Sequence, residues 1–213
     1  MIATLIGGTG LTGSFLLQRL LADSAITKVI SISRKPPKIS DAKLTEVLVS
    51  DLAQLPSMET KICGELYFCC LGTTISTAGS KENFEKVDHA AIVAFAKIAK
   101  AHDAKSFTLV SAMGANARSM FFYNQVKGRT EEDAKALGLR SLVIFRPALL
   151  VGPRHEFRMA EKIATKMLVP LSRFLSTRTQ KSLITEAETL ATRMLAEGKA
   201  APMGVHVIPA KDI

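Results

Sequence analysis

A glycine-rich turn near the N-terminus constrains the fold of this 213-residue chain more than any other feature. It follows a short apolar run, residues 2–6, and leads into an amphipathic stretch, residues 11–22. Glycines between a buried strand and a helix let backbone N–H groups approach a pyrophosphate, which the helix N-terminus also attracts. The alternative is a turn that serves only to reverse the chain. We predict a dinucleotide site whose contacts include Gly7, Thr9, Gly10, Leu11, Thr12 and Gly13.

Apolar segments with consecutive apolar positions recur along the chain, a pattern typical of strands covered on both faces. Amphipathic helical patterns lie between them, and this alternation indicates βαβ units. We therefore predict an α/β fold, a doubly wound parallel sheet in a single domain, residues 1–213. The candidate strands are 2–6, 28–33, 44–49, 66–71, 107–111, 142–146 and 205–208. The candidate helices are 11–22, 82–101, 122–137, 156–168 and 185–197, the last closed by Gly198.

Composition and the cysteines narrow the class of protein. Hydrophobic residues make up 47% of the chain and charged residues 22%, which excludes disorder. No apolar run approaches the ~20 residues of a membrane-spanning helix. The first strand begins at Ile2, so we expect no leader segment. Cys63, Cys69 and Cys70 lie in apolar sequence and are interpreted as reduced core thiols, which favours a cytoplasmic location.

The net charge of +9 is concentrated in two segments. Residues 28–38 contain four basic residues and no acidic one, and residues 154–181 contain seven basic and two acidic residues. The remainder of the chain holds 17 of each sign. Each segment therefore requires its own explanation.

The first basic segment bears on the choice of cofactor. NAD sites place an acidic residue about 20 residues beyond the glycines, to bind the ribose 2′-hydroxyl. Here the second strand ends in Ser33-Arg34-Lys35, with no acid. A 2′-phosphate suits the guanidinium of Arg34 and the charge of Lys35, so we predict NADP(H) rather than NAD(H). A solvated basic loop is the alternative.

Later strand ends complete a dinucleotide cleft, because ligands of open α/β sheets bind at the carboxyl ends of strands. Asp51 and Leu52 follow the third strand and are expected at the adenine. Leu71, Gly72 and Thr73 follow the fourth and are expected at the second half of the cofactor.

A serine, a tyrosine and a lysine suggest the chemistry. Tyr123 and Lys127 are four residues apart on one helix face, and Ser111 ends the fifth strand. A phenol ionises near pH 10, and a nearby ammonium lowers its pKa, which makes it a better acid–base group. We predict Tyr123 as proton donor, Lys127 as its partner and a ligand of the nicotinamide ribose, and Ser111 as the group that orients a carbonyl or hydroxyl. A chance Tyr–Lys spacing is the alternative, and the other tyrosine, Tyr67, is expected in the core.

Four segments together resemble the short-chain dehydrogenase/reductase superfamily, in its atypical branch, and most closely the oxidoreductase family of the Tat-interacting tumour suppressor. The resemblance implies that Gly7, Gly10 and Gly13 contact the pyrophosphate and Arg34 the 2′-phosphate. It implies catalysis by Ser111, Tyr123 and Lys127, and places Pro147 beside the nicotinamide. The segments are Gly7–Gly13, Phe68-Cys69-Cys70-Leu71-Gly72-Thr73-Thr74, Tyr123-Asn124-Gln125-Val126-Lys127-Gly128 and Phe145-Arg146-Pro147.

The chain departs from extended members of this superfamily in two ways. They carry an asparagine in the helix after the fourth strand, where this chain has Asp88. They also add a C-terminal substrate domain, which is absent here. Substrate recognition is therefore assigned to short loops and to residues 153–184, a small lid or docking segment.

The second basic segment, 154–181, has three explanations: a solvated helix face, a lid that holds an anionic substrate, or a surface that docks on acidic lipid or protein. Nucleic acid is not expected as a partner, because the segment carries no recognised nucleic-acid-binding motif. The four histidines lack metal-ligand spacing, so no metal is expected.

Two functions remain open from the sequence. The favoured one is an NADP(H)-dependent oxidoreductase that acts on a small-molecule carbonyl or hydroxyl substrate, as a monomer or homodimer. The other is a regulatory or interaction protein that binds NADP(H) without turnover.

Overall fold

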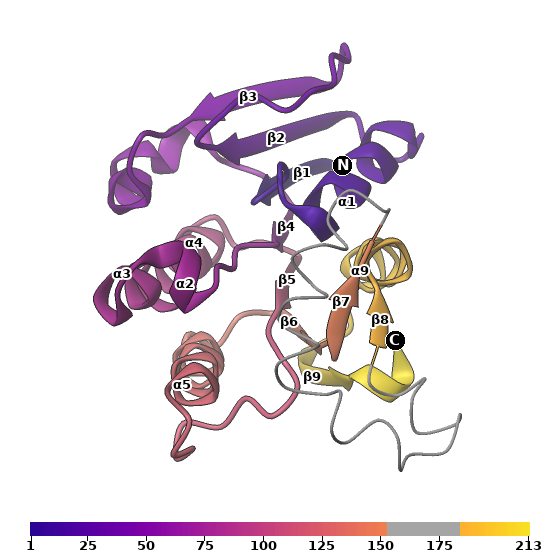
Figure 1. Ribbon diagram of the computed structural model, residues 1–213. Helices are drawn as coiled ribbons and strands as arrows, with labels where there is room; N and C mark the ends of the chain where they lie inside the picture. The colour runs from indigo at the N-terminus through magenta and orange to yellow at the C-terminus, as the bar shows by residue number, and fades with distance from the viewer. Residues whose placement is uncertain (153–183) are drawn as a thin grey trace.

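A seven-stranded parallel sheet forms the centre of the computed structural model, which describes residues 1–152 and 184–213 (Figure 1). The strand order is β3-β2-β1-β4-β5-β6-β9, so the order reverses beside β1. The predicted α/β fold is confirmed, and each predicted strand is present. Their bounds are β1 Ile2–Ile6, β2 Lys28–Ser33, β3 Leu44–Leu48, β4 Leu66–Cys69, β5 Ser106–Val110, β6 Ser141–Arg146 and β9 Gly204–Pro209.

Helices cover both faces of this sheet (Figure 1). Helices α1 (Leu11–Ala22) and α9 (Ala187–Ala200) pack on one face over Leu5, Phe68 and Phe145. Helices α4 (Ile92–Ala101) and α5 (Phe122–Ala136) pack on the other, over Ile6, Tyr67 and Ile144. Alternate residues of the inner strands thus enter two separate cores, which explains the consecutive apolar positions of these strands in the sequence. Tyr67 is fully buried, as predicted.

Several short elements were not predicted. Helix α2 (Ile75–Ala78) and the 3₁₀ helix η1 (Leu52–Lys61) lie in connections, and the 3₁₀ helix η3 (Ala210–Asp212) follows β9. Helix α3 (Lys81–Glu85) falls within the predicted helix 82–101. The predicted helix 82–101 is divided, because a π-helical turn, η2 (Lys86–Ala91), separates α3 from α4. Strands β7 (Leu149–Val151) and β8 (Ile184–Glu186) form a second, two-stranded parallel sheet.

The predicted helix 156–168 and the basic segment 154–181 lie outside the described residues, as does the segment 153–184 apart from Ile184 in β8. Within the part of the chain that the structure describes, no helix has both the length and the apolar character needed to cross a membrane.

Two details of the sequence analysis are wrong. Gly198 does not close α9 but lies inside it, where a β-carbon would come within 2.5 Å of the Phe68 ring. The helix instead ends at Ala201, whose φ is +46°. Cys63 is exposed, because it follows η1 in a connection and does not lie in a strand. Cys69 is buried as expected, and its burial raises the pKa of its thiol to about 12.

Candidate cofactor and catalytic site

The glycine turn joins β1 to α1 at the point where the strand order reverses. Gly7 has a φ of +84°, and a β-carbon there would lie 2.7 Å from the carbonyl of Cys70. A β-carbon on Gly13 would lie 2.1 Å from the Gly7 oxygen. Both positions therefore exclude any side chain. Gly10 begins α1 without a side-chain cap, so the first turn of the helix presents backbone N–H groups to an anion.

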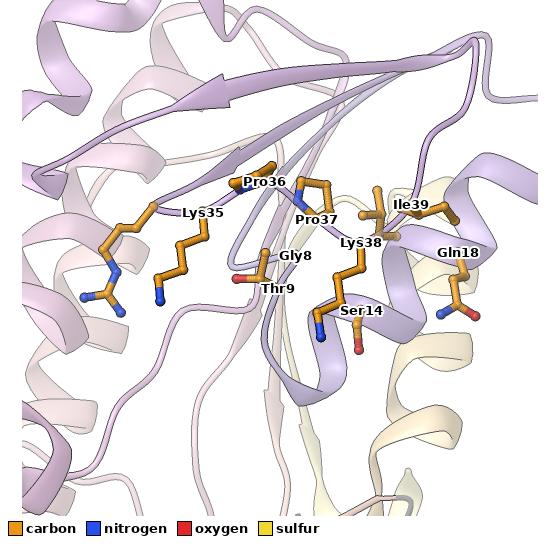
Figure 2. Close-up of a pocket in the computed structure, with 11 residues that line it drawn as sticks. Gly8, Thr9, Ser14, Gln18, Lys35, Pro36, Pro37, Lys38 and Ile39 are labelled. Atoms are coloured by element: carbon orange, nitrogen blue, oxygen red, sulfur yellow. The ribbon is translucent and has the colours of Figure 1, made fainter. Parts of the chain in front are cut away.

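A pocket of about 670 Å³ lies between this turn and the connection from β2 to β3. Figure 2 shows Lys35 and Lys38 extending from that connection toward Thr9 and Ser14. The lining of the pocket contains three cationic side chains and no carboxylate, which suits a phosphate group. The predicted Arg34 and Lys35 belong to it. The lining residues are Gly8, Thr9, Ser14, Leu17, Gln18, Arg34, Lys35, Pro36, Pro37, Lys38 and Ile39.

The predicted site residues after β3 and β4 differ in the contacts that they make within the protein. Asp51 caps η1, since its carboxylate accepts a hydrogen bond of 2.9 Å from the N–H of Ala53. Leu52 and Leu71 are partly buried against the core. Gly72 lies beside Lys127, because a β-carbon on it would be 3.8 Å from the lysine Nζ. The Thr73 N–H donates to Oδ2 of Asp88 over 2.9 Å.

Lys127 forms a buried ion pair with Asp88. Its Nζ lies 2.7 Å from Oδ1 of Asp88, and the two side chains are 5% and 0% exposed. Burial acts to lower the pKa of Lys127, but the charge of Asp88 and the proximity of Tyr123 outweigh it, so the pKa is raised. Lys127 therefore remains an ammonium at neutral pH.

Tyr123 stands beside this pair at the start of α5. It is 36% exposed, and its ring packs against Phe84 with a centroid distance of 5.6 Å. Within residues 1–152 and 184–213, no hydrogen bond to its hydroxyl is present. The structure thus brings Tyr123, Lys127 and Gly72 together at the carboxyl end of β4.

Ser111 belongs to a second buried cluster. Its hydroxyl donates to Oε1 of Glu131 over 2.6 Å, and Glu131 is 1% exposed. Arg146 donates to both oxygens of Glu131, from Nε over 2.9 Å and from Nη2 over 2.6 Å. The hydrogen bonds to Glu131 raise the pKa of Arg146. Glu131 and Arg146 are not among the predicted site residues, although Glu131 follows Lys127 by four residues on the same helix face.

The loop between β5 and α5 is held by two close contacts. Buried Pro147 accepts a hydrogen bond of 2.9 Å from the N–H of Met113 through its carbonyl. Gly128 permits the loop to lie on α5, because a β-carbon there would be 2.1 Å from the Ala117 nitrogen. The glycine that ends the Tyr-Asn-Gln-Val-Lys-Gly motif is therefore required by packing.

A family model described as NAD(P)H-binding matches residues 7–166. The chain belongs to this NAD(P)H-binding family. The match includes the glycine turn, the pocket beside it and the Tyr–Lys helix, so the predicted dinucleotide-binding class is confirmed.

Curated relatives support the same assignment. The protein fmp52 of Emericella nidulans is 39% identical over 166 residues, covering 75% of this chain and 71% of its own length. FMP52-2 of Scheffersomyces stipitis is 34% identical over 222 residues, covering 99% and 95%. Both are named mitochondrial, as are other relatives of 37–41% identity.

Solved structures share the fold at low sequence identity. MoeE5, in complex with UDP-glucose and NAD, is 15% identical with a TM-score of 0.73, covering 98% of this chain and 75% of its own. A short chain dehydrogenase family protein from Francisella tularensis is 14% identical with a TM-score of 0.69, covering 98% and 97%. The predicted doubly wound α/β fold is thereby confirmed.

The expected cytoplasmic location is wrong, since the relatives are named mitochondrial at 34–41% identity. Reduced thiols argue against the secretory pathway but do not distinguish among compartments inside the cell. Among residues 1–152 and 184–213, no three His, Cys, Asp or Glu side chains gather as a metal site would require. The absence of a metal stays a prediction.

Proposed function

We propose that the protein is an NADP(H)-dependent oxidoreductase of the mitochondrion that acts on a small carbonyl or hydroxyl compound. The observation that carries this proposal is the placement of Tyr123 beside the buried ammonium of Lys127, at the same sheet edge as the basic pocket. In this proposal the pocket binds the 2′-phosphate of NADP(H), and the glycine turn binds its pyrophosphate.

The cofactor, when bound, supplies or accepts a hydride at its nicotinamide. In reduction, Tyr123 donates its proton to the substrate oxygen as negative charge develops there. In oxidation the phenolate of Tyr123 takes the hydroxyl proton. Lys127 holds a ribose hydroxyl and places a positive charge near Tyr123.

Ser111 has a narrower role than a donor to a carbonyl. An ionised carboxylate only accepts hydrogen bonds, so the Ser111 proton is directed to Glu131. The lone pairs of Ser111 are then available to a donor, and a substrate hydroxyl is the group that fits. Ser111 therefore orients the alcohol form of the substrate.

A screen of NADPH oxidation over aldehydes, ketones and quinones tests this function. We expect turnover with at least one class, and we expect Tyr123→Phe to lower kcat by about 10²–10⁴-fold, the usual contribution of a general acid, while NADPH still binds. Turnover unchanged in Tyr123→Phe would refute the role of Tyr123. Binding without turnover of any substrate would instead support a regulatory NADP(H)-binding protein.

A further inference from the structure

Asp88 occupies a position that the proposed chemistry does not use directly. Its carboxylate is fully buried and holds two groups at once: Oδ1 lies 2.7 Å from Nζ of Lys127, and Oδ2 accepts the Thr73 N–H. Its backbone carbonyl accepts the Thr130 hydroxyl over 2.8 Å. Asp88 thus connects the end of β4 to two successive turns of α5.

The backbone at Asp88 is unusual as well. It lies in the π-helical turn η2, between α3 and α4, and π turns inside helices are uncommon and frequently occur at functional sites. The turn packs against α5, which carries Lys127. The π-helical turn therefore places the Asp88 carboxylate in the interface between η2 and α5. An uninterrupted α-helix would place this side chain differently.

The other titratable groups near Lys127 do not replace Asp88. Cys69 faces it from β4, and with a pKa of about 12 that thiol is neutral. Tyr123 faces it from α5 and is half-open to solvent. Glu131, one turn further along α5, is engaged by Arg146 and Ser111. Among the described residues, Asp88 is the carboxylate paired with Lys127.

We propose that Asp88 is a positioning residue that keeps Lys127 protonated and fixed beside Gly72 before any cofactor arrives. A buried lysine without an anion loses its proton readily. An asparagine at this position would accept a hydrogen bond but supply no charge. The role of Lys127 toward a ribose rests on the proposed function, whereas its protonation does not.

An NMR titration of Lys127 tests this proposal without cofactor. The Cε and Nζ resonances are assigned by their loss in Lys127→Met. In the wild-type protein we expect Lys127 to titrate above its ordinary pKa of 10.5, and in Asp88→Asn we expect the midpoint to fall by about one to three pH units. Asp133→Asn is the matched control, since it removes an exposed carboxylate from α5, the helix that carries Lys127. In the wild-type protein this carboxylate is paired with His89. Equal midpoints in Asp88→Asn and wild type would overturn the proposal.

Cofactor binding supplies a second readout. In a Tyr123→Phe background, which removes the phenol, we expect the NADPH dissociation constant of Asp88→Asn to rise about tenfold between pH 7 and pH 9.5, the scale of a charged hydrogen bond. In Tyr123→Phe alone, the NADPH dissociation constant should change by less than about twofold over the same pH range. A protein that binds no cofactor would refute the proposed function, and the NMR titration would still decide the role of Asp88.

Folding of the variant is itself informative. A buried ammonium left without its partner destabilises a fold more than removal of both partners. If Asp88→Asn does not fold, Asp88→Asn combined with Lys127→Met is expected to fold. A double variant no better folded than the single one would show that Asp88 acts independently of Lys127.

Discussion

Arg34 is the residue on which the proposed preference for NADP(H) depends most directly. It follows β2 directly, is exposed, and lines the pocket beside the glycine turn together with Lys35 and Lys38. We expect Arg34→Glu to weaken NADPH binding by about 10- to 100-fold, because a charge-assisted hydrogen bond to phosphate is lost and a repulsive charge is added. NADH binding should change little.

Lys28→Glu is the matched control for Arg34→Glu. Lys28 begins the same strand, is exposed, and makes the same change of charge at the opposite end of the sheet. Dissociation constants for NADPH and NADH from fluorescence titration provide the comparison. Equal affinity for the two cofactors in the wild-type protein, unaltered by Arg34→Glu, would contradict an NADP(H) preference.

Site residues differ in how far sequence reveals them. The placement of Arg34 and Lys35 in the pocket follows from chain position, because the end of the second strand always meets the glycine turn in this fold. The pairing of Asp88 with Lys127 was not predicted, although the sequence marks Asp88 as a departure. Charged residues on an amphipathic helix are usually solvated, and only the packing of η2 on α5 shows that these two are buried.

At the scale of the element, the C-terminus of α9 offers a direct test. Ala201 adopts a left-handed conformation, φ +46°, which disfavours residues with a β-carbon. We expect Ala201→Gly to raise the free energy of unfolding by about 0.5–1 kcal/mol, or Tm by roughly 1–4 °C.

Gly198→Ala, three residues earlier in the same helix, should have the opposite effect, because its methyl group would collide with Phe68. Overpacking of this kind costs about 1–3 kcal/mol. Thermal unfolding of both variants measures the contrast. A gain in stability for Gly198→Ala would place the helix end where the sequence suggested.

Elements were predictable where burial imposes a pattern. The five inner strands of the main sheet (β2, β1, β4, β5 and β6) carry consecutive apolar residues because both faces are covered, whereas the edge strands β3 and β9 are partly exposed. Strands β7 and β8 are three residues long and pair across a large sequence separation, so no local pattern reveals them. The π turn within the predicted helix 82–101 is likewise invisible, since one additional residue per turn leaves the apolar spacing nearly intact.

At the scale of the molecule, ion pairs connect parts of the chain that are distant in sequence. Lys199 on α9 lies 2.5 Å from Asp23 after α1, and Lys105 before β5 lies 2.6 Å from Glu65 before β4. The hydrogen bond from Lys199 lowers the pKa of Asp23, and that from Lys105 lowers the pKa of Glu65. Sequence gives the charges but not these pairings, because the topology decides which ends meet.

Both carboxylates have a lower pKa in the folded protein than in the unfolded chain. Their contribution to stability is therefore complete above the unfolded values, about 4, and is lost as the pH falls through the folded values. We expect Tm to decline below about pH 4.5. In Asp23→Asn we expect the fall in Tm between pH 6 and pH 3 to be smaller than in the wild-type protein by roughly 1–3 °C. Asp212→Asn, an exposed carboxylate in no ion pair of the described residues, is the control. An acid limb of the same slope in Asp23→Asn and wild type would show that the pair with Lys199 contributes nothing to the stability of the folded state.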